Sequence, residues 1–175
     1  MTTDHGRDGG DSDLLALWLM RRDVEVGKLQ AADGPALPDG FLFDYSPASL
    51  PVLEDAALAY QAQTAAEGHG SRIAFYTLAL AAYLGETILH TAGGHWDWEG
   101  SEEDGTPLVL VDPVLKAGPV RLRDIVERAL TEATGGVFAE EHGWMQIAAD
   151  AQHQSDPAWR PVQAEGGTHQ AGPQR

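Results

Sequence analysis

The residues best suited to acid–base or metal chemistry in this chain are Glu86, His90 and His95, which lie close together in the sequence. If residues 86–90 are helical, Glu86 and His90 are four residues apart and share one face of the helix. A carboxylate and an imidazole held side by side can transfer protons or bind a metal ion. The sequence therefore carries one catalytic hypothesis, a small hydrolase or metal-dependent enzyme that uses these three side chains.

The wider sequence favours a non-catalytic interpretation. It contains neither the Glu-x-x-His motif of di-iron helices nor the His-Glu-x-x-His motif of zinc proteases. It also lacks the Gly-x-Ser-x-Gly motif of serine hydrolases and the glycine-rich loops that bind phosphates. A histidine near a helix end interacts favourably with the helix dipole, so a Glu–His pair there is commonly a surface hydrogen bond. We therefore expect no catalytic residue, metal ion or cofactor, and keep the enzyme as the alternative.

The excess of negative charge is the main compositional feature, with 27 acidic residues against 11 basic ones and a formal net charge of -16. Nucleic acids and anionic membranes repel such a chain, so we expect neither as a partner. Between Arg72 and Lys116 the sequence has no lysine or arginine. We expect a basic protein partner to contact the acidic residues Asp97, Glu99, Glu102, Glu103 and Asp104. The simpler alternative is a solvated acidic face that only aids solubility.

Length and composition predict a single cytoplasmic domain. The 175 residues are enough for one hydrophobic core, and the absence of cysteine excludes disulfides and thiolate ligands. The acidic N-terminus lacks the basic and then apolar order of a signal peptide. The longest apolar run, residues 73–84 with only Thr77 interrupting, is shorter than the roughly twenty residues that span a membrane, so we expect it to be a buried helix.

Periodicity and turn residues predict the elements that would position these side chains. We expect a short helix from Ser12 that ends near Arg22. Further helices are expected from Ser46 or Ser49 to Gly68, from Ser71 to Ala92, from Leu122 to Ala133 and over residues 137–149. Helix and strand compete over residues 23–29, because Val24 and Val26 alternate with polar residues. Gly85 is unfavourable inside the third of these helices, which indicates close packing against a neighbouring element.

A hairpin is expected after Gly93-Gly94, since glycine adopts the left-handed conformation that ends many helices. Alternation over residues 95–99 places Trp96 and Trp98 on one face of a strand and polar residues on the other. Residues 107–112 form the returning strand. We expect the two tryptophans to pack on the helix that precedes the glycines.

These elements predict an α+β fold, with a small antiparallel sheet packed against three to five helices. The domain is expected over residues 12–150. Residues 1–11 and 151–175 are rich in glycine and polar residues, and we expect them to be disordered tails. Trp159 is the residue of the C-terminal tail most suited to packing against the domain.

Three short motifs, in this order, resemble those of a group of small bacterial proteins of unknown function. They are Asp44-Tyr45-Ser46-Pro47-Ala48-Ser49-Leu50 at a helix start, Tyr83-Leu84-Gly85-Glu86 within a helix, and Gly93-Gly94-His95-Trp96 at a turn into a strand. The resemblance covers about residues 41–134 and implies a shared fold, but no activity. Small acidic domains of this kind are also similar to bacterial immunity proteins, which neutralise basic toxins, and this analogy agrees with protein binding.

Overall fold

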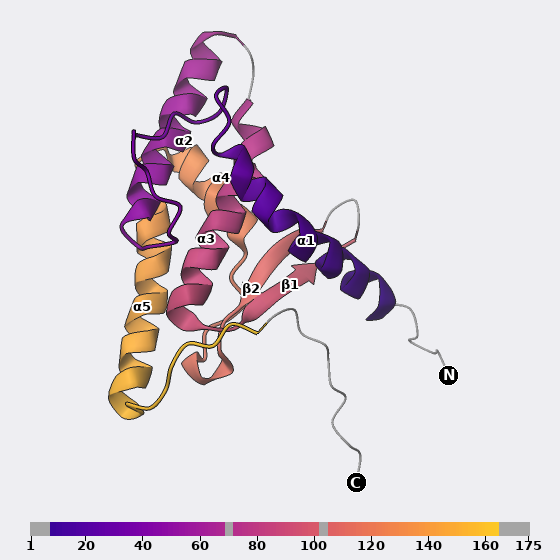
Figure 1. Cartoon of the computed structure of the whole chain (residues 1–175), viewed down its shortest axis with the longest axis vertical. Helices are drawn as coiled ribbons and strands as arrows, with labels where there is room; N and C mark the ends of the chain where they lie inside the picture. The colour runs from indigo at the N-terminus through magenta and orange to yellow at the C-terminus, as the bar shows by residue number, and fades with distance from the viewer. Residues whose placement is uncertain (1–7, 69–71, 102–104, 165–175) are drawn as a thin grey trace.

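The computed structural model describes residues 8–68, 72–101 and 105–164, and of residues 8–11 it describes only the backbone (Figure 1). Within these ranges the chain forms five α-helices, two short 3-10 helices and a two-stranded antiparallel sheet. The elements are α1 (Asp8–Lys28), α2 (Ser49–Ala66), η1 (Arg72–Tyr76), α3 (Thr77–Ala92), β1 (His95–Glu99), β2 (Thr106–Leu110), η2 (Pro113–Leu115), α4 (Leu122–Glu132) and α5 (Val137–Ser155). The predicted α+β fold is confirmed.

Helix α3 is the centre of the core. Its residues 79–89 are all buried, and it contacts α1, α4 and α5. Figure 1 shows α3 in the middle of the molecule, between α5 on one side and α1 with the sheet on the other. The stretch Arg72–Ala92 is long and apolar enough to cross a membrane by length and composition alone, but 67% of it is buried inside the protein. Such burial is what the core helix of a globular domain shows.

The hairpin places one face of β1 against this core. Trp96 lies opposite Val109 and Asp97 lies opposite Leu108, so alternate residues point to opposite faces. Trp96 is 2% exposed, and Trp98 is partly buried against the same core. The predicted inward orientation of the two tryptophans is therefore confirmed. His95, Asp97 and Glu99 lie on the outer face, together with Leu108 and Leu110 of β2.

Gly85 allows the sheet to approach α3 closely. A Cβ atom added at Gly85 would overlap the ring of Trp96 and lie 2.8 Å from Leu122 Cδ1. The ring of Trp96 also packs edge-on against Trp18 of α1, with ring centroids 5.3 Å apart. The close packing predicted from this glycine is therefore confirmed, and it joins α1, α3, α4 and β1 around one indole.

Residues 23–29, where helix and strand compete in the sequence, continue α1 as helix to Lys28. Val26 is buried with Trp18 on the face of α1 that packs against the rest of the core, and Leu29, the residue after the helix, is also buried, whereas Val24 is 66% exposed. Helix is therefore favoured over strand in this segment, because the helical period buries Val26 on the face that Trp18 occupies and brings Leu29 into the core. Ser71, the expected cap of the next helix, lies outside the described residues.

The C-terminal part of the described chain differs from the expected tail. Helix α5 continues to Ser155, and the following residues return to the start of β1. The backbone of Gly94 accepts a hydrogen bond from Ala164 N and donates one to Val162 O, both at 2.9 Å. Trp159 Nε1 donates to Asp112 Oδ2 at 3.0 Å, as expected of a residue that packs back. The domain boundaries of 12 and 150 thus fall inside helices α1 and α5.

Candidate functional site

The three short motifs of the sequence meet around Tyr83 and Glu86. Tyr45 N–H donates to the Tyr83 hydroxyl at 3.2 Å, and the hydroxyl lies 2.8 Å from Ser49 Oγ. Ser49 donates its own proton to Ser46 O at 2.6 Å, so Tyr83 is the donor to Ser49. Ser49 is therefore not the N-cap of α2, a position that Ala48 occupies. Burial raises the pKa of Tyr83 and keeps it a neutral donor.

Glu86 is 8% exposed and holds three elements together. Its carboxylate accepts a hydrogen bond from Trp96 Nε1 of β1 at 2.8 Å. The same oxygen pairs with Arg22 Nη1 of α1 at 3.1 Å. These contacts satisfy the buried charge, as a carboxylate in the protein interior requires. They also leave Glu86 committed to the fold rather than open to a substrate.

His90 and His95 lie apart from the Glu86 carboxylate. His90 is exposed on α3, where its ring packs edge-on against Tyr45 at 5.5 Å. His95 lies on the outer face of β1, opposite Leu110, whereas the Glu86 partner Trp96 points inward. Within the described ranges, no hydrogen bond or ion pair joins any two of Glu86, His90 and His95. Nor does that part of the chain hold three His, Asp or Glu side chains placed to bind a metal ion.

Tyr45 also belongs to this region, although from the sequence it is identified only as part of a motif at a helix start. Its φ of 53° is left-handed, which is rare for an aromatic residue. Its ring lies between Tyr83, at 4.9 Å, and His90. Burial, followed by the negative charge of Glu86, raises the pKa of Tyr45. The hydrogen bond to Tyr83 and these ring contacts hold the backbone of Tyr45 in the left-handed conformation. No motif in the sequence predicts this conformation.

The acidic residues of β1 form the second candidate site. Asp97 is half-buried, and its Oδ1 accepts a hydrogen bond from Trp98 N at 2.8 Å. Glu99 is exposed and accepts from Arg121 Nε and Nη2 at 2.8 and 2.9 Å. The hydrogen bond from Arg121 holds the pKa of Glu99 below its ordinary value. Glu102, Glu103 and Asp104 lie outside the described residues.

A hollow with an open mouth lies beside these carboxylates, on the outer face of the hairpin. This hairpin hollow has a volume of about 740 Å³, and Asp97, Glu99, Ser101, Leu108, Leu110 and Pro119 contribute to its lining. Pro119 belongs to a segment that runs along β2, where Val120 and Val109 exchange backbone hydrogen bonds of 2.8 and 3.1 Å. The hairpin hollow thus combines apolar walls with two carboxylates, and it suits an aliphatic side chain that carries a positive charge.

Many basic side chains of the described residues are neutralised by ion pairs within the chain. The ion pairs of the described residues include Arg22–Glu86, Arg72–Asp33, Arg121–Glu99, Arg123–Glu127 and Arg128–Glu141. Because acidic residues outnumber basic ones by 27 to 11, pairing of this kind leaves most carboxylates unmatched. The molecule therefore presents a surplus of negative charge to solvent.

Comparison with models of known protein families, with curated proteins and with solved structures finds no match to this chain. What the protein does must therefore be inferred from its own geometry.

Proposed function

We propose that this chain is a non-catalytic, cytoplasmic protein-binding domain whose contact surface is the outer face of the β1–β2 hairpin. The observation that carries the proposal is the position of Asp97 and Glu99 beside Leu108 and Leu110 in the lining of the hairpin hollow. A lysine or arginine of a basic partner can place its aliphatic stem against Leu110 and Pro119 and its charge beside the carboxylates, whereas Leu108 is buried beneath them. The analogy with immunity proteins points to the same partner chemistry.

Asp97 is the carboxylate most available to a partner. Its Oδ1 accepts one hydrogen bond from the backbone, and within the described part of the chain its Oδ2 accepts none. A cation that approaches Glu99 must instead compete with Arg121, which already binds both of its oxygens. We therefore expect Asp97 to contribute more to binding than Glu99.

The enzyme alternative has less support from the same observations. Glu86 is buried and already binds Trp96 and Arg22, and His95 lies on the other face of the strand that carries Trp96. A proton-transfer site would need these groups within reach of one substrate. The docking hypothesis needs only outward carboxylates beside an apolar surface.

The test is capture of partners from a lysate by the immobilised full chain, at about 0.05 M and about 0.5 M salt, which changes the screening length severalfold. Asp97→Asn removes the charge but keeps an acceptor for Trp98 N–H, and Asp97→Lys reverses the charge. The matched control is Glu132→Lys, the same charge reversal at an exposed position on α4. We expect a partner that is lost at high salt and with Asp97→Lys, weakened by Asp97→Asn and retained by Glu132→Lys.

A different pattern would reject the proposal. If the captured proteins are unaffected by Asp97→Lys and by reversal of Glu102, Glu103 and Asp104 to lysine, the acidic face serves solubility alone. Equal losses with Asp97→Lys and Glu132→Lys would show that net charge matters and that the hairpin hollow does not.

A further inference from the structure

A second hollow lies between α1, α3 and β1, on the side of the hairpin opposite to the acidic residues. This α1 hollow has a volume of about 270 Å³. Its apolar lining consists of Leu14, Leu17 and Trp18 of α1, Leu78 of α3 and Trp98 of β1. Leu17 is 50% exposed and Leu78 is 38% exposed, so the apolar lining extends to the surface. An apolar hollow with a few polar groups is the usual form of a small-molecule site.

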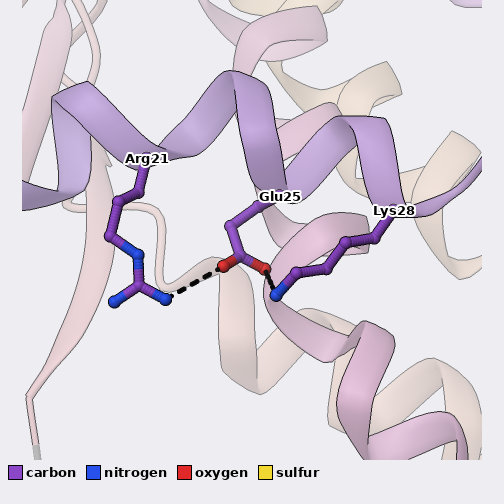
Figure 2. Close-up of polar contacts among 3 residues, drawn as sticks. All are labelled: Arg21, Glu25 and Lys28. Atoms are coloured by element: carbon purple, nitrogen blue, oxygen red, sulfur yellow. Dashed lines mark hydrogen bonds and ion pairs between the residues drawn. The ribbon is translucent and has the colours of Figure 1, made fainter.

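The polar groups of the α1 hollow are Arg21 and Glu25, which follow the apolar residues along the same face of α1. Figure 2 shows Glu25 between Arg21 and Lys28, with all three side chains on one side of the helix. The carboxylate lies 3.3 Å from Arg21 Nη2 and 2.6 Å from Lys28 Nζ. Glu25 is 2% exposed, whereas the side chain of Arg21 is 66% exposed. Arg21 and Lys28 thus share the one buried carboxylate of Glu25, which leaves one net positive charge among these three residues at the polar end of the α1 hollow.

The lining also has hydrogen-bond donors that lack acceptors. A guanidinium has five N–H groups, and among the described residues Arg21 directs its hydrogen bond to Glu25 through Nη2. The indole N–H of Trp18, a residue only 5% exposed, has no acceptor in the described part of the chain. The indole N–H of Trp98 also lacks one, but it lies close to Gly105 of the hairpin turn. Both indole nitrogens are closed off from solvent, so the donors open to a ligand are the N–H groups of Arg21 that Glu25 does not bind.

We propose that the α1 hollow binds a small amphipathic carboxylate, whose apolar body lies among Leu14, Leu17, Leu78 and Trp98 and whose carboxylate pairs with Arg21. Leu14 and Arg21 are separated by seven residues, or about 10 Å along the helix axis. This length fits the extended chain of a monocarboxylate of about eight carbons. The docking surface proposed above is centred on the other face of β1. Trp98 lines both hollows, so the two sites are distinguished by variants of Asp97 and Arg21, each of which lines only one of them.

The test is titration of the full ¹⁵N-labelled chain with sodium octanoate, 1-octanol and octylammonium chloride, which share one tail and differ in the charge of the head. The indole N–H signals of the tryptophans are followed, and Trp18→Phe assigns the signal of Trp18. We expect octanoate to shift the Trp18 signal and to bind about tenfold more tightly than octanol, because a hydrogen bond to a charged group is the stronger one. Octylammonium should bind most weakly.

Two variants and a control localise the site. Arg21→Gln should weaken octanoate binding about tenfold and leave octanol binding unchanged, since only the carboxylate uses the guanidinium. Arg123→Gln is the matched control, because Arg123 also pairs with a glutamate four residues later on an exposed helix face. Leu17→Trp should fill the hollow and block all three probes, and thermal unfolding by circular dichroism confirms that the variants fold.

Several results would overturn the proposal. Tightest binding of octylammonium would mean that Glu25, rather than Arg21, selects the ligand. Octanoate affinity unchanged by Arg21→Gln would remove the basis for a carboxylate. Shifts confined to the exposed Trp144 would indicate detergent-like binding elsewhere. If no probe binds at millimolar concentration but Leu17→Trp releases a captured protein, the hollow receives a partner's side chain instead of a small acid.

Discussion

The buried carboxylate of Glu86 accepts a hydrogen bond from the indole N–H of Trp96, with 2.8 Å between Oε1 and Nε1. The sequence presents Glu86 as half of a candidate acid–base pair and Trp96 as a core residue. The bond between them makes both residues part of one buried junction that also includes Arg22. Glu86 therefore has a structural role that its spacing from His90 does not reveal.

Removal of this carboxylate should destabilise the protein. Glu86→Ala leaves the Trp96 N–H without an acceptor and Arg22 without its partner, at a cost of about 2–4 kcal/mol. Glu86→Gln keeps an acceptor for Trp96 and should cost less. Urea unfolding, followed by tryptophan fluorescence, measures both. A Glu86→Ala protein as stable as the parent would show that the carboxylate is not a structural anchor, and would strengthen the enzyme alternative.

Gly85→Ala should destabilise the protein although alanine is the better helix former. The propensity gain is about 1 kcal/mol, but the added methyl group overlaps Trp96 and approaches Leu122. Overpacking of this kind costs about 1–3 kcal/mol and outweighs the gain. Gly143→Ala on α5 is the control, because a Cβ atom there meets nothing within 4 Å. Thermal unfolding should show a lower melting temperature for Gly85→Ala and a higher one for Gly143→Ala than for the parent. A higher melting temperature in both variants would contradict the close packing of Trp96 on Gly85.

Glu54 should anchor the start of α5, a helix that lies more than eighty residues later in the chain. Its carboxylate accepts hydrogen bonds from Val137 N at 3.0 Å and Phe138 N at 2.9 Å, and the residue is 1% exposed. The N-cap residue Gly136 has no side chain to provide these acceptors. Glu54→Ala should therefore cost about 2–3 kcal/mol.

Hydrogen exchange at the first turn of α5 gives a local measurement of the same contact. We expect faster exchange of the Val137 and Phe138 amides in Glu54→Ala and little change in Asp55→Ala, whose side chain is exposed. Equal exchange in the two variants would mean that α5 begins without help from α2.

Stability should fall as the pH drops below 6.5 because of His142. This residue is 4% exposed, its Nε2 lies 2.7 Å from Thr91 Oγ1, and burial lowers its pKa from 6.5. Between the lowered pKa and 6.5 the unfolded chain binds a proton that the folded chain does not, so acid favours unfolding in that window. Above 6.5 both states are neutral at this site, and the effect vanishes.

Urea unfolding midpoints between about pH 8 and pH 5 measure this dependence. Most carboxylates titrate below this range and therefore contribute little to it. His142→Gln should flatten the profile, whereas His153→Gln, at an exposed position on the same helix, should leave it unchanged. A parent profile that is already flat would contradict the effect of burial on His142.

Local sequence determined most of the elements, because their signals act over a few residues. Gly93 and Gly94 adopt positive φ values at the end of α3, which glycine reaches without a steric penalty. Alternation over residues 95–99 sets the face of each tryptophan, and the apolar residues on nearly every face of α3 mark it as the buried helix. Gly85 even indicates where another element approaches, since its propensity cost needs a compensating contact.

The roles of the charged residues were decided only by the tertiary structure. Whether Glu86 is an acid, a ligand or an anchor depends on Trp96 and Arg22, and the acceptor for the first amides of α5 comes from Glu54 of another helix. The α1 hollow likewise combines residues of three elements. A side chain's burial and partners arise from contacts between segments distant in the chain, and the free energy of a charged group depends on those contacts more than on its neighbours in sequence.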